Sequence, residues 1–122
     1  INVFAKAVPK KIAYEVIDQY PHDPKNFVQG FLLEGNTIYE SEGQYGSSRI
    51  IKYPLGTMTP VAETKQDKEY FSEGATIIGD KVYQLTWREK KGFVYDKNTL
   101  KFEKRGDNRG IMKHSESYHI VL

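Results

Sequence analysis

Two short segments place a polar side chain between a phenylalanine and a glycine, and these side chains are the first candidates for chemistry. The segments are FVQG at 27–30 and FSEG at 71–74, so the polar residues are Gln29 and Glu73. A carboxyl group among aromatic side chains suits acid–base catalysis, because desolvation raises its pKa toward the working pH. The amide of Gln29 can donate and accept hydrogen bonds, and so could orient a bound amide or carbonyl. From position alone, a surface carboxylate is the commoner role for Glu73, and a turn-stabilising hydrogen bond is an equal alternative for Gln29.

Three aromatic residues could form the wall of a pocket at this place. Phe27 and Phe71 precede the two polar residues, and Trp87 is the single tryptophan of the chain. Such a wall would fold a flexible ligand into a reactive conformation, and an indole can also contact a cation or donate its N–H. Core packing between repeated units is the alternative for all three, and Trp87 is the strongest candidate for a ligand contact.

Metal and thiol chemistry are not expected. The chain has no cysteine, and its three histidines, His22, His114 and His119, show neither HxxxH nor HExxH spacing. His22 and the neighbouring Asp23 lie in a proline-bracketed turn, for which a structural role is predicted. The sequence therefore predicts a site without a metal ion or organic cofactor.

The two polar segments belong to an internal repeat. FVQG and GNTIY at 35–39 recur 44 residues later as FSEG and GDKVY at 79–83. Gly-Asn and Gly-Asp between apolar runs indicate hairpins, since these residues tolerate the positive φ of tight turns. Each unit is predicted to contain four strands: 28–34, 37–42, 48–54 and 60–66 in the first, and 72–78, 81–87, 92–96 and 101–105 in the second.

Four strands in a period of roughly 40 to 50 residues are typical of a β-propeller blade, and an accidental likeness within a small meander sheet is the alternative. We expect an all-β chain of about two blades, at 27–68 and 71–106, within a single partial domain spanning 1–122. Residues 12–20 alternate as a strand does and are predicted to be an additional N-terminal strand. The tail at 107–122 matches neither repeat and stays unassigned.

Charge and hydropathy exclude some partners. The net charge is +2, from 18 basic and 16 acidic residues scattered along the chain, so neither a nucleic-acid patch nor an acidic tail is indicated. No apolar run approaches the roughly 18 residues of a membrane-spanning helix. The start lacks an initiator methionine and a signal-peptide stretch, which is typical of a mature or trimmed chain.

Several segments in order resemble the metal-independent glutaminyl cyclases of plants and bacteria, which are five-bladed β-propellers. These segments are YPHDPKNFVQG at 20–30, ESEGQYGSSR at 40–49, EYFSEG at 69–74, GDKVYQLTW at 79–87 and GFVYD at 92–96. The resemblance covers roughly residues 12–104. It departs at Val28, where threonine is usual, and at Ser72, where glycine is usual. After Arg105 it ends, and the GWGL segment with its pocket tryptophan, and the later Asn, Trp and Lys, have no counterpart.

The resemblance implies that Glu73 is the catalytic carboxyl and Gln29 a pocket residue. The expected activity is glutaminyl-peptide cyclotransfer, the conversion of N-terminal glutamine to pyroglutamate with release of ammonia. The alternative is a truncated, catalytically silent propeller fragment with a binding or structural role. The expected partner is a peptide or amino acid with N-terminal glutamine, with neither nucleic acid nor membrane involved, and a second copy could complete the propeller. By family analogy the chain is expected to be secreted or periplasmic.

Overall fold

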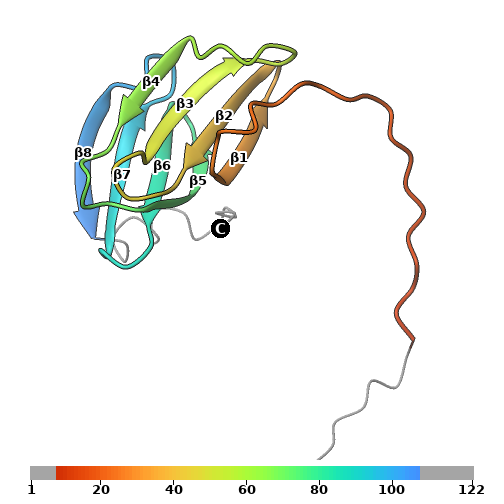
Figure 1. Ribbon diagram of the computed structural model, residues 1–122, viewed down its shortest axis with the longest axis horizontal. Coiled ribbons are helices and arrows are strands. Elements are labelled where there is room, and N and C mark those ends of the chain that lie inside the picture. Colours follow the sequence, from red (N-terminus) through yellow and green to blue (C-terminus); the bar gives the residue numbers. More distant parts are fainter. Residues whose placement is uncertain (1–7, 108–122) are drawn as a thin grey trace, which may run out of the picture.

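The computed structural model describes residues 8–107, and every regular element in this part of the chain is a β-strand. Eight strands form two four-stranded antiparallel sheets, each in sequential order, which confirms the predicted all-β, blade-like fold (Figure 1). Residues 8–107 contain no helix that could cross a membrane. The first sheet contains β1 (Val28–Glu34), β2 (Thr37–Glu42), β3 (Arg49–Pro54) and β4 (Ala62–Lys65), and the second contains β5 (Ser72–Ile78), β6 (Lys81–Thr86), β7 (Lys91–Asp96) and β8 (Phe102–Asp107).

Both predicted hairpins form. Glu34 pairs with Thr37 across a two-residue turn, and Ile78 pairs with Lys81 in the same way. The first turn residue is glycine in each case, and its φ is 59° at both Gly35 and Gly79. Glycine takes this left-handed conformation without steric cost, which is why the turn direction can be read from the sequence.

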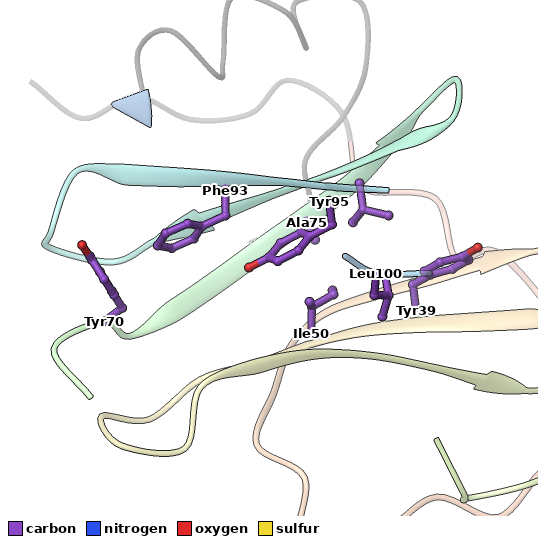
Figure 2. Close-up of a cluster of buried hydrophobic side chains, with 8 residues drawn as sticks. Tyr39, Ile50, Tyr70, Ala75, Phe93, Tyr95 and Leu100 are labelled. Carbon is purple, nitrogen blue, oxygen red and sulfur yellow. The ribbon is translucent and has the colours of Figure 1, made fainter. Parts of the chain in front are cut away.

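The main core lies between the two sheets. Figure 2 shows Phe93 and Tyr95 of the second sheet facing Tyr39 and Ile50 of the first, with Leu100 between them. All five side chains are nearly or fully buried. Because each sheet turns an apolar face toward the other, packing the two together removes from water a surface that either sheet alone would expose.

The N-terminal strand predicted at 12–20 does not form. Residues 8–20 contain no strand, all are exposed, and the segment runs away from both sheets (Figure 1). Alternation of apolar and polar side chains makes a segment compatible with a sheet. A strand also needs a neighbouring strand for its backbone hydrogen bonds. The predicted blades at 27–68 and 71–106 each enclose one sheet, apart from Asp107 at the end of β8. Their grouping into one partial domain stays a prediction, and residues 108–122 of the tail lie outside the described residues.

The innermost strands of the two sheets, β1 and β5, approach closely at a pair of glycines. A Cβ atom added to Gly30 would lie 2.9 Å from the backbone nitrogen of Ala75 and 3.3 Å from the Cα of Gly74. Backbone atoms cannot move aside cheaply, so only glycine fits at position 30. The repeated glycine after each polar residue therefore marks the contact between the two units.

We expect Gly30→Ala to lower the free energy of unfolding by about 2 kcal/mol, because the added methyl group overpacks the contact between β1 and β5. Gly106→Ala is the matched control, since a Cβ there meets no atom within 4 Å and φ is not positive. Urea unfolding followed by circular dichroism measures both. Equal stability of the two variants would show that the strands can separate at no cost.

Removing core volume tests the packing between the sheets. Ile50 is fully buried, and Ile50→Ala is expected to destabilise the fold by about 3 kcal/mol through lost burial and the cavity left behind. Ile12→Ala makes the same chemical change at a side chain that is 87% exposed. Its unfolding midpoint should match that of the unsubstituted chain, and a comparable loss in both variants would contradict the assignment of the core.

Candidate functional site

Gln29 and Glu73 come together between the two sheets. Gln29 lies in β1 and Glu73 in β5, and their side chains interact closely enough for the Gln29 amide to lower the pKa of the Glu73 carboxyl. In each strand the pairing register shifts at this place, between Val28 and Gly30 in β1 and between Ser72 and Ala75 in β5. Such bulges bend a strand and redirect its side chains. The repeat thus places an amide and a carboxyl group at equivalent irregularities of neighbouring strands.

The environment of Glu73 favours its neutral form. Burial is the main cause that raises the pKa of the Glu73 carboxyl above its usual value, and the negative charge of Glu89 raises it further. The hydrogen bond from Gln29 acts in the opposite direction, because it stabilises the carboxylate. The result is a carboxyl group whose affinity for a proton is higher than that of an exposed glutamate.

An aromatic cluster lies beside this pair, with Phe71 at its centre. The Phe71 ring contacts Phe27 at a centroid distance of 6.0 Å, Trp87 at 5.4 Å and Tyr45 at 5.4 Å, each in an edge-to-face arrangement. Trp87 is 50% exposed and Phe27 is 47% exposed. Half-exposed rings do not serve as core, so the geometry favours a wall facing solvent for these two residues. We name Phe27, Tyr45, Phe71 and Trp87 the aromatic wall.

A glycine makes room for this wall. A Cβ atom at Gly43 would lie 2.5 Å from the Phe71 ring, 2.9 Å from the Ser72 carbonyl oxygen and 3.0 Å from the Gln29 side chain. The Gly43 N–H donates to the Phe27 carbonyl at 2.9 Å, and 44 residues later the Trp87 N–H donates to the Phe71 carbonyl at 2.9 Å. The same backbone bond thus recurs in both units, with glycine in one and tryptophan in the other.

Two serines of the first unit, Ser41 in β2 and Ser48 just before β3, bind the backbone of β5. The Ser41 hydroxyl donates to the Glu73 carbonyl and accepts a hydrogen bond from the Gln84 amide at 2.7 Å. The Ser48 hydroxyl accepts the Ser72 N–H at 2.9 Å. Backbone groups of Ser72 and Glu73, where the register shift begins, are therefore bound by serines of the preceding unit.

The segment before β1 is fixed by a buried carboxylate. Glu40 of β2 is fully buried, contacts the His22 ring, and accepts hydrogen bonds from the Asn26 amide at 3.0 Å and the Tyr53 hydroxyl at 2.5 Å. His22 thus packs as a structural residue, as its turn predicts. Because Asn26 directly precedes Phe27, these bonds also anchor one end of the aromatic wall.

Two residues near the site were missed by the sequence reasoning. Tyr45 lies in the loop between β2 and β3, and Glu89 lies in the loop between β6 and β7. They are 44 residues apart, at equivalent places of the two units. The repeat offset was the available signal, although only the structure shows that both loops reach Phe71.

A separate hollow of about 530 Å³ lies at the outer side of the sheets, and none of the five predicted site residues lines it. Two of the polar side chains that line it, Gln66 and Arg105, form hydrogen bonds within the protein. The Gln66 side-chain amide donates to the side-chain amide oxygen of Gln84 at 2.9 Å, and Arg105 donates to the Tyr70 hydroxyl at 3.0 Å. The residues predicted from the sequence to carry chemistry thus lie away from this hollow.

Comparison with known proteins agrees with the motifs and the fold. Residues 2–111 match the family described as glutamine cyclotransferase. A glutaminyl-peptide cyclotransferase of Arabidopsis thaliana is 42% identical over 87 residues, which are 70% of this chain and 27% of that protein. The chain therefore aligns with about a quarter of the relative's length. With its two four-stranded sheets and its ordered motifs, the chain belongs to the glutamine cyclotransferase family.

Proposed function

We propose that this chain carries the proton-transfer and glutamine-binding groups of a glutaminyl-peptide cyclotransferase, which converts N-terminal glutamine to pyroglutamate and releases ammonia. The observation that supports this most is the pairing of Glu73 with Gln29 beside the aromatic wall, where the pKa of Glu73 is raised. Family membership and the printed name of the Arabidopsis relative point to the same reaction.

The reaction needs one group that first accepts and then donates a proton. The α-amine nitrogen of the substrate attacks its own γ-amide carbon, so a C–N bond forms and the bond to the amide nitrogen breaks. Glu73, as carboxylate, takes a proton from the attacking amine and returns it to the leaving nitrogen, which departs as ammonia. One carboxyl group therefore accounts for both the proton removed and the proton delivered. A pKa raised by burial brings it nearer the working pH, where such transfer is most effective.

Binding and orientation are assigned to the remaining residues. The Gln29 amide, which interacts with Glu73, would donate or accept a hydrogen bond to the substrate amide or carbonyl. The rings of Phe27, Phe71 and Trp87 would hold the flexible glutamine side chain folded back toward its amine. Restricting that freedom before reaction lowers the entropic part of the barrier.

The wider expectations stay predictions. A peptide or amino acid with N-terminal glutamine is the proposed substrate, and a second copy could supply further blades around the open site. A secreted or periplasmic location, and catalysis without a metal ion, stay predictions from the family resemblance.

Glu73→Gln is expected to reduce ammonia release from glutaminyl-β-naphthylamide by about a hundredfold or more, because the isosteric amide cannot shuttle a proton. Glu69→Gln changes an exposed glutamate of the same segment and should leave the rate unaltered. Circular dichroism checks that both variants fold. Full activity in Glu73→Gln would remove Glu73 from the mechanism, whereas a folded but inactive unsubstituted chain would favour the silent-fragment alternative.

The raised pKa of Glu73 can be tested without turnover. Carbon-detected NMR titration of the side-chain carboxyls should place this pKa above the usual glutamate value, with the Glu73→Gln variant identifying the resonance. Gln29→Leu should raise the pKa further, because it removes a hydrogen bond that favours the charged form. Gln19→Leu, on the exposed N-terminal segment, is the control. A Glu73 pKa that stays constant in Gln29→Leu would contradict the amide–carboxyl pairing.

A further inference from the structure

The two repeated units differ at three equivalent pairs that all lie at the site. Gln29 corresponds to Glu73, Gly43 to Trp87, and Tyr45 to Glu89, each 44 residues apart. The proposed function uses the first two differences and leaves the third unexplained. The loop after β2 and the loop after β6 meet at Phe71 through these equivalent residues, since the Tyr45 ring contacts the Phe71 ring and the Glu89 carboxylate accepts the Phe71 N–H.

Glu89 binds groups from three parts of the site. Its Oε1 accepts the Phe71 N–H at 3.1 Å and its Oε2 accepts the Arg88 N–H at 2.8 Å. Its carboxylate also interacts with the Tyr45 side chain and raises the pKa of the Tyr45 hydroxyl. The bond to Arg88 lies within the loop and could stabilise any turn. The interactions with Phe71 and Tyr45 reach residues 18 and 44 positions away in the sequence, which a role confined to the loop does not require.

We propose that Glu89 is a positioning residue of this site, whose carboxylate ties Phe71 and Tyr45 to the loop that carries Trp87. The inference rests on the proposed function and deepens it. Hydrogen bonds to an ionised acceptor are roughly twice as strong as neutral ones, so one carboxylate can hold several donors in place. Tyr45 and Trp87 are about half exposed, so burial restrains their rings less than it restrains a core side chain.

The first unit supports this reading by contrast. There the position of Glu89 is taken by Tyr45, and the position of Trp87 by Gly43, so that unit has no indole to hold. An acidic acceptor thus occurs in the unit that carries both the tryptophan and Glu73. Its charge also acts on Glu73 directly, since it is one of the causes that raise the pKa of that carboxyl.

The single tryptophan makes the wall observable without catalysis, because all indole fluorescence comes from Trp87. Acrylamide quenching is compared in the unsubstituted chain and in Glu89→Ala, Glu89→Gln and Glu69→Ala. We expect Glu89→Ala to be quenched more strongly, because Phe71 and Tyr45 lose their common acceptor and Trp87 its packing partners. Glu89→Gln keeps an acceptor oxygen and should restore most of the protection, and the exposed Glu69 control should equal the unsubstituted chain. Unchanged quenching in Glu89→Ala would overturn the proposal.

If Glu89→Ala does not fold by circular dichroism, Tyr45→Phe takes its place. That variant keeps the ring and removes only the hydroxyl that interacts with Glu89, so a positioning role still predicts stronger quenching of Trp87. Quenching equal to that of the unsubstituted chain would again overturn the proposal.

Turnover and titration give a second reading. Loss of the charge-assisted bonds should raise KM for glutaminyl-β-naphthylamide about tenfold in Glu89→Ala, with a smaller change in kcat. Glu89→Gln should lower the pKa of Glu73 toward its usual value, because a nearby negative charge is removed. If the unsubstituted chain releases no ammonia, the proposed cyclotransferase activity fails for this chain, while quenching still decides the role of Glu89.

Discussion

A methyl group at Gly30 would lie 2.9 Å from the backbone nitrogen of Ala75, so β1 and β5 reach their observed separation only because no side chain stands between them. The position of the site depends on this contact. The register shifts of the two strands fall beside the glycines, and the residues that the bulges redirect are Gln29 and Glu73. A wider spacing would leave both side chains in solvent, where neither amide nor carboxyl would have a partner.

Buried polar residues in the second strand of each sheet provide the next level of support. Glu40 and Gln84 are both fully buried and lie 44 residues apart. Each accepts a hydrogen bond from a tyrosine of the third strand, Tyr53 in one sheet and Tyr95 in the other. Burying a polar side chain is costly unless it is hydrogen-bonded, so Glu40 and Gln84 require their tyrosine partners to stay in place.

The partners of Glu40 and Gln84 include residues from equivalent positions upstream of the first strand of each sheet. His22 contacts Glu40, and Gln66, 44 residues later, donates to Gln84. The repeat therefore begins upstream of the first strand of each unit and includes the connecting segment. This explains why the motif around His22 accompanies a site to which the histidine itself contributes no reacting atom.

The strands and hairpins could be predicted because they depend on local features: alternation of side chains, and glycine where φ must be positive. The strand at 12–20 was wrong because alternation says nothing about whether a neighbouring strand is available. The bulges at Gln29 and Glu73 were also beyond prediction, since a seven-residue strand reads the same with or without an extra residue in its register. The repeat identified Gln29 and Glu73 as equivalent positions, but the contacts that Tyr45 and Glu89 make with Phe71 from their loops depend on the tertiary structure.

The first unit has Gln29 where the second has Glu73, and this difference has a chemical consequence for the Glu73 carboxyl. Two carboxyl groups within hydrogen-bond distance share a proton, and they then titrate as a pair with one pKa strongly raised. A glutamate at position 29 would hold one of the two carboxyls protonated and so reduce the supply of free base. The amide instead donates a neutral hydrogen bond that favours the carboxylate of Glu73. Burial and the charge of Glu89 raise the pKa of Glu73, whereas Gln29 lowers it. The proton affinity of this one carboxyl therefore depends on Gln29 of the first unit as well as on Glu89 of the second.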